Sequence, residues 1–266
     1  MPPSIPIRVS IPIRGRSLAV ALFEPSERKS EVILIHGFTG SKEDFDEVGI
    51  LMAAAGFRVL TFDLRGQHES EHAIDLGMYS MESLGRDVIE LSEHLSFAEP
   101  HLLGHSFGGL ITQQAALLSP QTWASITFMC SGPGGQIDHI DYPEFENLSN
   151  DTKAENWERF RAEKYADDPR LELLRKRWME SDATATLTFN ERLRNQESLI
   201  PQLANFGIPA HVIYGEDDDA WPIHEQNRMA EELNAVLTVL PNCGHCPNEE
   251  DPELLVQELV RFWNSC

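Results

Sequence analysis

The sequence predicts an α/β fold: a doubly wound, mostly parallel sheet of eight strands with a helical cap insertion. Apolar, strand-like runs alternate with helix-like segments along most of the chain, as in a parallel sheet covered by helices. Residues 32–35 are all apolar, which is typical of a strand buried on both faces. The alternation stops between residues 136 and 201. We therefore expect a core of residues 1–135 and 202–266 and a helical cap of residues 136–201.

Local patterns place the individual elements in chain order. Residues 7–13 and 17–24 alternate apolar and polar side chains around an Arg-Gly-Arg turn, which predicts an antiparallel hairpin. Ser41 and Gly56 mark the start and the end of a helix, because serine caps helix N-termini and glycine ends helices. Further strands are expected at 57–62, 100–103, 124–130, 208–214 and 235–240. Further helices are expected at 81–95, after Ser106, at 223–233 and from Pro252, with Asp251 as the N-cap of the last.

One short stretch places a strand end, a tight turn and a helix start around a serine. Its sequence, Gly104-His105-Ser106-Phe107-Gly108, has the pattern G-x-S-x-G, in which the central residue is strained and the flanking glycines leave room for the turn. The free N–H groups of the following helix point at the serine, so an oxyanion could form there. A chain with 17 glycines can contain this pentapeptide by chance. The flanking strand and helix favour a nucleophile instead.

Two further polar groups follow predicted strands and are expected near Ser106. Reactive groups of parallel sheets gather beyond the carboxyl ends of the strands. The aspartate cluster 217–219 and His245 both lie in such loops. A serine hydroxyl is a weak nucleophile, so it needs a neutral imidazole to take its proton and a carboxylate to orient that imidazole. These groups therefore form a candidate triad in which the acid is one of three aspartates.

The motifs resemble those of the α/β-hydrolase fold superfamily, in particular its small cofactor-free serine esterase and lipase-like group. The resemblance includes the H-G-F-T-G loop at 36–40, a G-x-x-D loop and a G-H loop after the last strand. It also includes the strand-turn-helix motif at Ser106, which is called the nucleophile elbow in this family. It implies that Asp218 is the acid, that His245 is the base and that no cofactor is needed. The family's D-x-R-G-x-G-x-S loop departs from its pattern at His68, which replaces a glycine. A serine nucleophile argues against dehalogenase and epoxide hydrolase chemistry.

The backbone N–H groups of Phe38 and Phe107 are expected to form the oxyanion hole. A glycine-bearing loop after a central strand can aim one N–H group across the top of the sheet, and the residue after the nucleophile supplies the other. The alternative is that the loop around Phe38 is an ordinary strand-to-helix turn. We expect His36 to brace this loop rather than to act in catalysis.

Several other side chains have competing interpretations. Most aromatic residues of the cap segment are expected to pack its helices together, and Trp157 and Trp178 are the substrate-binding candidates among them. His105 is expected to point away from the serine. Surface positions are expected for His68, His72 and His224.

The four cysteines are expected to be reduced thiols, because their number and spacing do not resemble a disulfide framework. Cys243, His245 and Cys246 could suggest a metal or redox site. Structural zinc needs four ligands, however, and no second ligand cluster is visible in the sequence. We therefore expect no metal.

The formal net charge of −22 bears on partners and location. Such an acidic surface repels phosphate backbones and anionic headgroups, so we expect neither nucleic-acid nor membrane binding. The sequence has no signal-peptide pattern and no run of transmembrane length, which favours a cytoplasmic location. The expected partner is a small-molecule ester substrate, and the oligomeric state is not predicted.

These observations favour a serine hydrolase that cleaves a carboxylic ester of a small or medium-sized substrate through an acyl-enzyme. The first alternative keeps the triad and changes the reaction, as in a C–C bond hydrolase or the synthase of the menaquinone pathway. The second alternative is a receptor on the hydrolase fold that binds a small molecule without turnover. Neither is excluded by the sequence.

Overall fold

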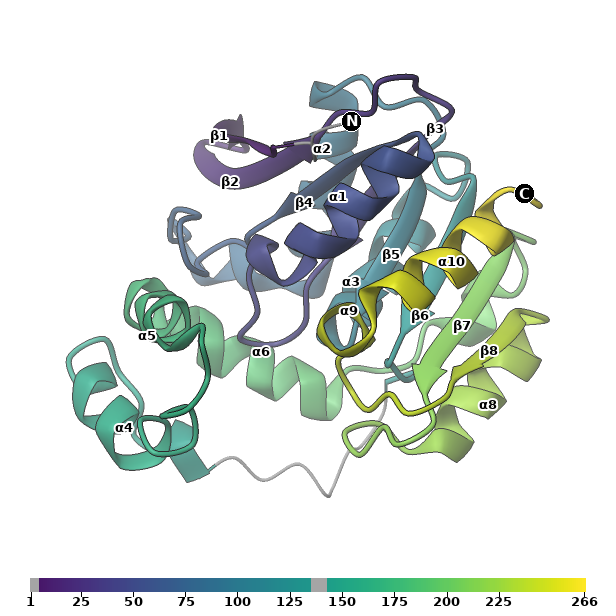
Figure 1. Ribbon diagram of the computed structural model, residues 1–266. Helices are drawn as coiled ribbons and strands as arrows, with labels where there is room; N and C mark the ends of the chain where they lie inside the picture. Colours follow the sequence, from purple (N-terminus) through teal and green to yellow (C-terminus); the bar gives the residue numbers. More distant parts are fainter. Residues whose placement is uncertain (1–4, 135–142) are drawn as a thin grey trace.

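The computed structural model describes residues 5–134 and 143–266, and it contains one eight-stranded sheet of order β1-β2-β4-β3-β5-β6-β7-β8 (Figure 1). The strands are β1 (Ile7–Ile13), β2 (Arg16–Phe23), β3 (Ser30–Ile35), β4 (Phe57–Phe62), β5 (His101–His105), β6 (Ser125–Met129), β7 (Ala210–Gly215) and β8 (Val236–Leu240). β2 is antiparallel to β1 and β4, and all other neighbours are parallel. The predicted fold class is confirmed.

The central strands are buried on both faces, which explains why their sequences lack polar alternation. β5, β6 and β7 are buried at every position, and β3 is buried everywhere except at Ser30. The edge strand β8 differs, because Val236, Leu237 and Val239 are exposed. Since β3 to β8 are parallel, the loops after β3, β5, β7 and β8 meet at one edge of the sheet.

Helices cover both faces of the sheet (Figure 1). α1 (Asp46–Ala55) packs against α10 (Pro252–Trp263) on one face. On the other face, α2 (Met81–His94) packs against α3 (Phe107–Leu118), and α7 (Ile200–Leu203) joins α3 to α8 (Ile223–Leu233). Within the described residues, no helix has the length and apolar character needed to cross a membrane.

The helix ends agree with the sequence in most places. Gly56 ends α1 in the left-handed conformation, and the Asp251 side chain accepts from the Leu254 N–H at the start of α10. The helix expected after Ser41 begins instead as a 3₁₀ turn, η1 (Lys42–Phe45), before α1 starts at Asp46. A further helical turn, α9 (Pro247–Glu250), was not predicted, because four residues carry no readable periodicity.

The segment expected to form the cap is helical where the structure describes it. It contains η3 (Pro143–Phe145), α4 (Lys153–Phe160), α5 (Leu171–Glu180) and α6 (Ala183–Asn195). α4 and α5 lie beyond the sheet edge in Figure 1 and share a small apolar cluster of their own. α6 instead adds Phe189 and Leu193 to the main core. Residues 136–142 of the expected cap lie outside the described residues, and the boundaries 136–201 stay a prediction.

Candidate active site

Ser106 lies between the end of β5 and the start of α3, in a strained backbone conformation. Its φ of 52° and ψ of −116° are unusual for a residue with a side chain. Three hydrogen bonds hold its backbone there: its N–H donates to the Met129 carbonyl at 2.9 Å, and its carbonyl accepts from Ser131 Oγ at 2.7 Å and from the Gly109 N–H at 2.9 Å. The turn therefore presents the hydroxyl beyond the strand end, as the pentapeptide predicts.

The glycines of the elbow are required by close backbone approach. A Cβ on Gly104 would collide with the backbone of Gly108 and Gly109. A Cβ on Gly108 would collide with the carbonyl of Ile35 at the end of β3. The absence of side chains thus lets α3 start directly against two strands, and it brings the Ser106 turn next to the loop after β3.

His245 and Asp218 come from the loops after β8 and β7 and are directly bonded. His245 Nδ1 lies 2.9 Å from Asp218 Oδ1, and the Asp218 side chain is fully buried. Asp218 also accepts hydrogen bonds from Gln226 Nε2 at 2.9 Å and from the Ala220 N–H at 3.0 Å. Burial alone would raise the pKa of Asp218, but the hydrogen bond and charge of His245 outweigh it and lower the pKa below its usual value. The carboxylate is therefore charged at neutral pH and fixes the ring.

Ser106 and His245 line one cavity of about 320 Å³, which we call the Ser106 cavity. The structure thus brings together the serine, the histidine and, behind the histidine, the aspartate. Among the described residues, no hydrogen bond joins the Ser106 hydroxyl to the His245 ring. Such contacts are often long without substrate and tighten in the complex.

The expected oxyanion-hole residues flank the same cavity. Phe107 is the first residue of α3, a position whose N–H has no partner within the helix. Phe38 follows Gly37 in the loop after β3 and lines the Ser106 cavity. His36 braces this loop: its Nε2 accepts from the Leu64 N–H at 3.1 Å, so Nδ1 carries the proton and donates to the Gly37 carbonyl at 2.8 Å. Burial lowers the pKa of His36 to about 4, which keeps the ring neutral.

His105 contacts the histidine of the site rather than the serine hydroxyl. Its Nε2 lies 2.9 Å from the backbone carbonyl of His245, so this nitrogen carries the proton and donates. Burial first, and then the neighbouring His245, lower the pKa of His105 to about 4. The neutral ring therefore helps to hold the loop that carries His245.

The two tryptophan candidates do not line the Ser106 cavity. Trp157 and Trp178 are buried within the cap cluster, where the Trp178 indole donates to the Lys153 carbonyl at 3.1 Å. Both rings also line a second, smaller cavity, which shares Arg161, Tyr165 and Arg177 with the Ser106 cavity. The aromatic side chains that line the cavity are Phe38, Phe145, Tyr165 and Trp221. Trp221 was not considered from the sequence, although it lies only three residues after Asp218.

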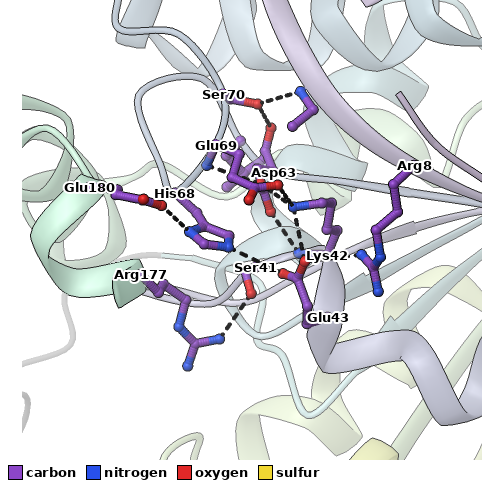
Figure 2. Close-up of polar contacts among 12 residues, drawn as sticks. Arg8, Ser41, Lys42, Glu43, Asp63, His68, Glu69, Ser70, Arg177 and Glu180 are labelled. Atoms are coloured by element: carbon purple, nitrogen blue, oxygen red, sulfur yellow. Dashed lines mark hydrogen bonds and ion pairs between the residues drawn. The ribbon is translucent and has the colours of Figure 1, made fainter. Parts of the chain in front are cut away.

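The loop 63–70 joins the sheet to the cap through a buried polar network (Figure 2). The Lys42 ammonium lies 2.8 Å from Asp63 and from Glu69, and Glu69 also pairs with Lys176 of α5 at 2.8 Å. These hydrogen bonds, from Lys176 first and then Lys42, lower the pKa of Glu69 to about 2. One carboxylate thus connects a buried lysine of the core to a cap helix.

His68 is buried in this network, so the expectation that it lies on the surface is wrong. Its ring Nδ1 lies 2.9 Å from Glu180 at the end of α5, and its backbone N–H donates to Ser181 Oγ at 3.0 Å. Its φ of 45° lies in the left-handed region, where glycine is favoured, which fits its replacement of the family's glycine. The polar sequence around His68 suggested an exposed loop. The cap covers this loop, however, so it is buried despite its polar composition. His72 and His224 are exposed, as expected.

Two groups of residues have ligand atoms close enough to hold a metal ion, among the described residues. In the first, Cys130 joins Asp218 and His245, but burial raises the pKa of the Cys130 thiol, which disfavours the thiolate that metals bind. In the second group, Glu43, His68 and Glu69, both glutamates already pair with the Lys42 ammonium, which supplies the positive charge. Neither arrangement favours a metal centre. All four cysteines are free thiols.

Comparisons with known proteins agree with this architecture. The model of the alpha/beta hydrolase family matches residues 32–258. The uncharacterized hydrolase YugF of Bacillus subtilis (strain 168) is 26% identical over 247 residues, which cover 88% of this chain and 90% of the relative. A 2-hydroxy-6-oxononadienedioate/2-hydroxy-6-oxononatrienedioate hydrolase of Paraburkholderia xenovorans (strain LB400) is 26% identical over 250 residues, covering 87% and 86%.

Solved structures show the same fold. A variant of the N-acyl homoserine lactonase AidH, crystallised with N-hexanoyl homoserine, aligns with a TM-score of 0.81 and 21% identity over 98% of both chains. The family match covers far more than half of the chain, and the similar proteins carry hydrolase names over most of their length. The chain is therefore a hydrolase that belongs to the alpha/beta hydrolase family.

Proposed function

We propose that the protein is a serine hydrolase that cleaves a carboxylic ester of a small or medium-sized molecule. In the first half-reaction Ser106 Oγ attacks the ester carbonyl while His245 Nε2 takes the hydroxyl proton, and the N–H groups of Phe38 and Phe107 stabilise the oxyanion. The His245 imidazolium then gives its proton to the leaving alcohol. Water, deprotonated by the same ring, hydrolyses the acyl-enzyme and restores Ser106.

The observation that carries this proposal is the 2.9 Å bond between His245 and Asp218 at a cavity that also contains Ser106. Because Asp218 binds Nδ1, the other ring nitrogen is left as the base. The charged carboxylate also stabilises the imidazolium that forms when the serine loses its proton. The apolar part of the cavity, which includes Phe145, Leu193 and Trp221, suits the acyl chain of an ester.

Turnover of p-nitrophenyl butyrate by the wild type and by Ser106→Ala tests the proposal. Loss of the attacking oxygen is expected to lower kcat by at least about a thousandfold. Ser26→Ala is the matched control, since Ser26 is exposed in the loop between β2 and β3, and it should retain wild-type activity. Undiminished turnover by Ser106→Ala would overturn the assignment.

A second candidate is C–C bond hydrolysis with the same triad, which the name of the Paraburkholderia relative favours. An activated ester and a vinylogous diketone acid, assayed side by side, separate the two reactions. A kcat/KM that is higher for the ester supports the proposed function, and the reverse supports the second candidate. Covalent labelling by a fluorophosphonate without turnover of either substrate would instead indicate a binding protein.

A further inference from the structure

The cap differs in charge from the rest of the chain. Residues 153–194 contain ten Lys and Arg against nine Asp and Glu, whereas the remaining residues contain eleven against thirty-four. Almost half of all the cations therefore lie in a short segment of a protein whose net charge is −22. An acidic surface repels anions at long range, so a site for an anion needs cations placed locally.

Four of the cap cations line the Ser106 cavity. They are Arg161, Lys164, Arg170 and Arg177. The cavity also has three carboxylates in its lining, those of Asp44, Glu144 and Glu249. The buried lining residues Phe145, Leu193 and Trp221 are apolar, whereas Lys164, Arg170 and Glu249 are exposed. Arg161 is a buried cation of the lining, so the buried part is largely apolar with one charge, and the exposed part, the rim, is charged.

Three of these cations have carboxylate partners from the same lining. Arg177 Nη1 donates to Asp44 at 2.6 Å and to Ser41 Oγ at 3.2 Å, the second of which Figure 2 shows. Arg161 pairs with Glu144 at 3.3 Å, and Arg170 pairs with Glu249. Arg170 also pairs with Asp168 at 3.1 Å, so each of the three guanidinium groups is held by at least one carboxylate.

Lys164 is the cation that remains. Among the carboxylates of the described residues, none lies within ion-pair distance of its ammonium group, which lies 5.3 Å from the ring centre of Tyr165, another lining residue. Lys164 is therefore the one cation of this lining, among the described residues, whose charge no carboxylate pairs with directly. Arg177 adds hydrogen-bonding capacity, because its two bonds to the core use only Nη1 of a group with five N–H donors.

We propose that the natural ester carries an anionic group, a carboxylate or a phosphate, which Lys164 and Arg177 bind at the rim while the acyl chain occupies the apolar interior. The anionic group lies on the alcohol side of the ester. This inference rests on the proposed function, since it places the ester carbonyl at Ser106. Lys164 sets specificity here and takes no part in the bond-breaking steps.

A matched pair of substrates tests the inference: 4-(butyryloxy)benzoate and its neutral amide, 4-(butyryloxy)benzamide. The measured quantity is the ratio of their kcat/KM values at 0.15 M salt, where charges beyond about 8 Å are largely screened. The ratio is taken as the benzoate over the benzamide, and it is divided by the same ratio of their alkaline hydrolysis rates, which corrects for their different intrinsic reactivity. For the wild type, this corrected ratio should exceed one. Lys164→Gln should lower it about three- to tenfold, and Lys164→Glu should lower it further.

Arg175→Gln is the control, because Arg175 is an exposed cation of α5 that does not line the cavity, and its ratio should equal that of the wild type. An equal fall in Arg175→Gln would mean that only the overall charge matters and would overturn the inference. So would a wild-type ratio at or below the alkaline value, or a ratio unaffected in Lys164→Gln. If neither ester is turned over in a Ser106-dependent manner, the proposed function itself fails, which is a distinguishable result.

Discussion

In the sheet, β5, β6 and β7 bury every residue, whereas the cap helices α4 and α5 bury only a few side chains each around a cluster of six. α6 packs apolar side chains into the core, whereas α5 contacts the core through polar pairs, such as Lys176 with Glu69, Glu180 with His68, and Arg177 with Asp44. The residues of the candidate triad are positioned by the backbone of the loops that follow β5, β7 and β8. The lining that selects a substrate depends on charged side chains of the cap.

This difference indicates which changes should affect chemistry and which should affect the cap. Exposed ion pairs contribute about 0–1 kcal/mol each, so they orient the cap more than they stabilise it. Buried hydrogen bonds to charged groups contribute about 1.5–3 kcal/mol. We therefore expect changes at the triad to lower activity without unfolding the protein. Changes at the cap junction should instead lower the free energy of unfolding, by about 3 kcal/mol or less.

The largest expected effect is that of Asp218→Asn on catalysis. An amide at this position cannot stabilise the imidazolium and favours the wrong tautomer of His245, so kcat for p-nitrophenyl butyrate should fall by about 10²–10⁴-fold. Asp217→Asn is the control, since Asp217 is exposed and adjacent in the same loop. Equal activity of the two variants would show that the bond to His245 has no catalytic role. The fold of both is checked by their urea unfolding midpoints.

A second expected effect is acid destabilisation of the core. Burial lowers the pKa values of four core histidines to about 4; they are His36, His101, His105 and His211. Their rings take up protons near pH 6.5 in the unfolded chain and near 4 in the folded one. The stabilising effect is therefore fully present above pH 6.5, and the free energy of unfolding falls between pH 6.5 and 4. The fall is up to about 1.4 kcal/mol per pH unit for each ring.

Urea unfolding between pH 7 and 4.5 measures this loss. His101→Phe should reduce the slope of the free energy of unfolding against pH by the equivalent of about one bound proton. His224→Gln should leave the slope unchanged, because His224 is 79% exposed. Residues 143–201 contain no histidine, so the described cap residues should not contribute to this proton uptake. An unchanged slope in His101→Phe would contradict the assignment of the lost stability to the buried rings.

The smallest expected effect concerns the junction between core and cap. Tyr79 Oη donates to Asp182 at 2.6 Å, and Asp182 caps the start of α6. Tyr79→Phe leaves that buried carboxylate without one donor, so the free energy of unfolding should fall by about 1–3 kcal/mol. Lys176→Gln removes an exposed ion pair across the same junction and should change it by less than about 1 kcal/mol. A larger loss of unfolding free energy in Lys176→Gln than in Tyr79→Phe would contradict the view that the buried hydrogen bond stabilises the junction more than the exposed ion pair.

The sequence predicted the core well because its signals are local. An all-apolar run predicts β3, and a pentapeptide with two glycines predicts the Ser106 turn, since the backbone there has few alternatives. The pairing of Asp218 with His245 followed from family resemblance, because three adjacent aspartates offer the same chemistry. Only Asp218 of the three is buried, which the sequence does not encode locally.

The cap could not be predicted in the same way. The role of Trp157 and Trp178 in substrate binding stays a prediction, because aromatic residues on short helices have the same sequence pattern whether they face a pocket or a neighbouring helix. His68 was expected on the surface, because burial by a segment more than 100 residues away leaves no trace in a polar loop. The ion pairs of the rim likewise join residues far apart in sequence.

Peptide mapping after reaction with a fluorophosphonate tests most directly whether Ser106 is the nucleophile. The account predicts one adduct per chain, on the peptide that contains Ser106, with ester turnover lost in proportion to labelling. No adduct should form in Ser106→Ala, and labelling should be slower in Asp218→Asn. Full ester turnover by a protein whose Ser106 is completely labelled, or a stoichiometric adduct on another residue, would contradict it.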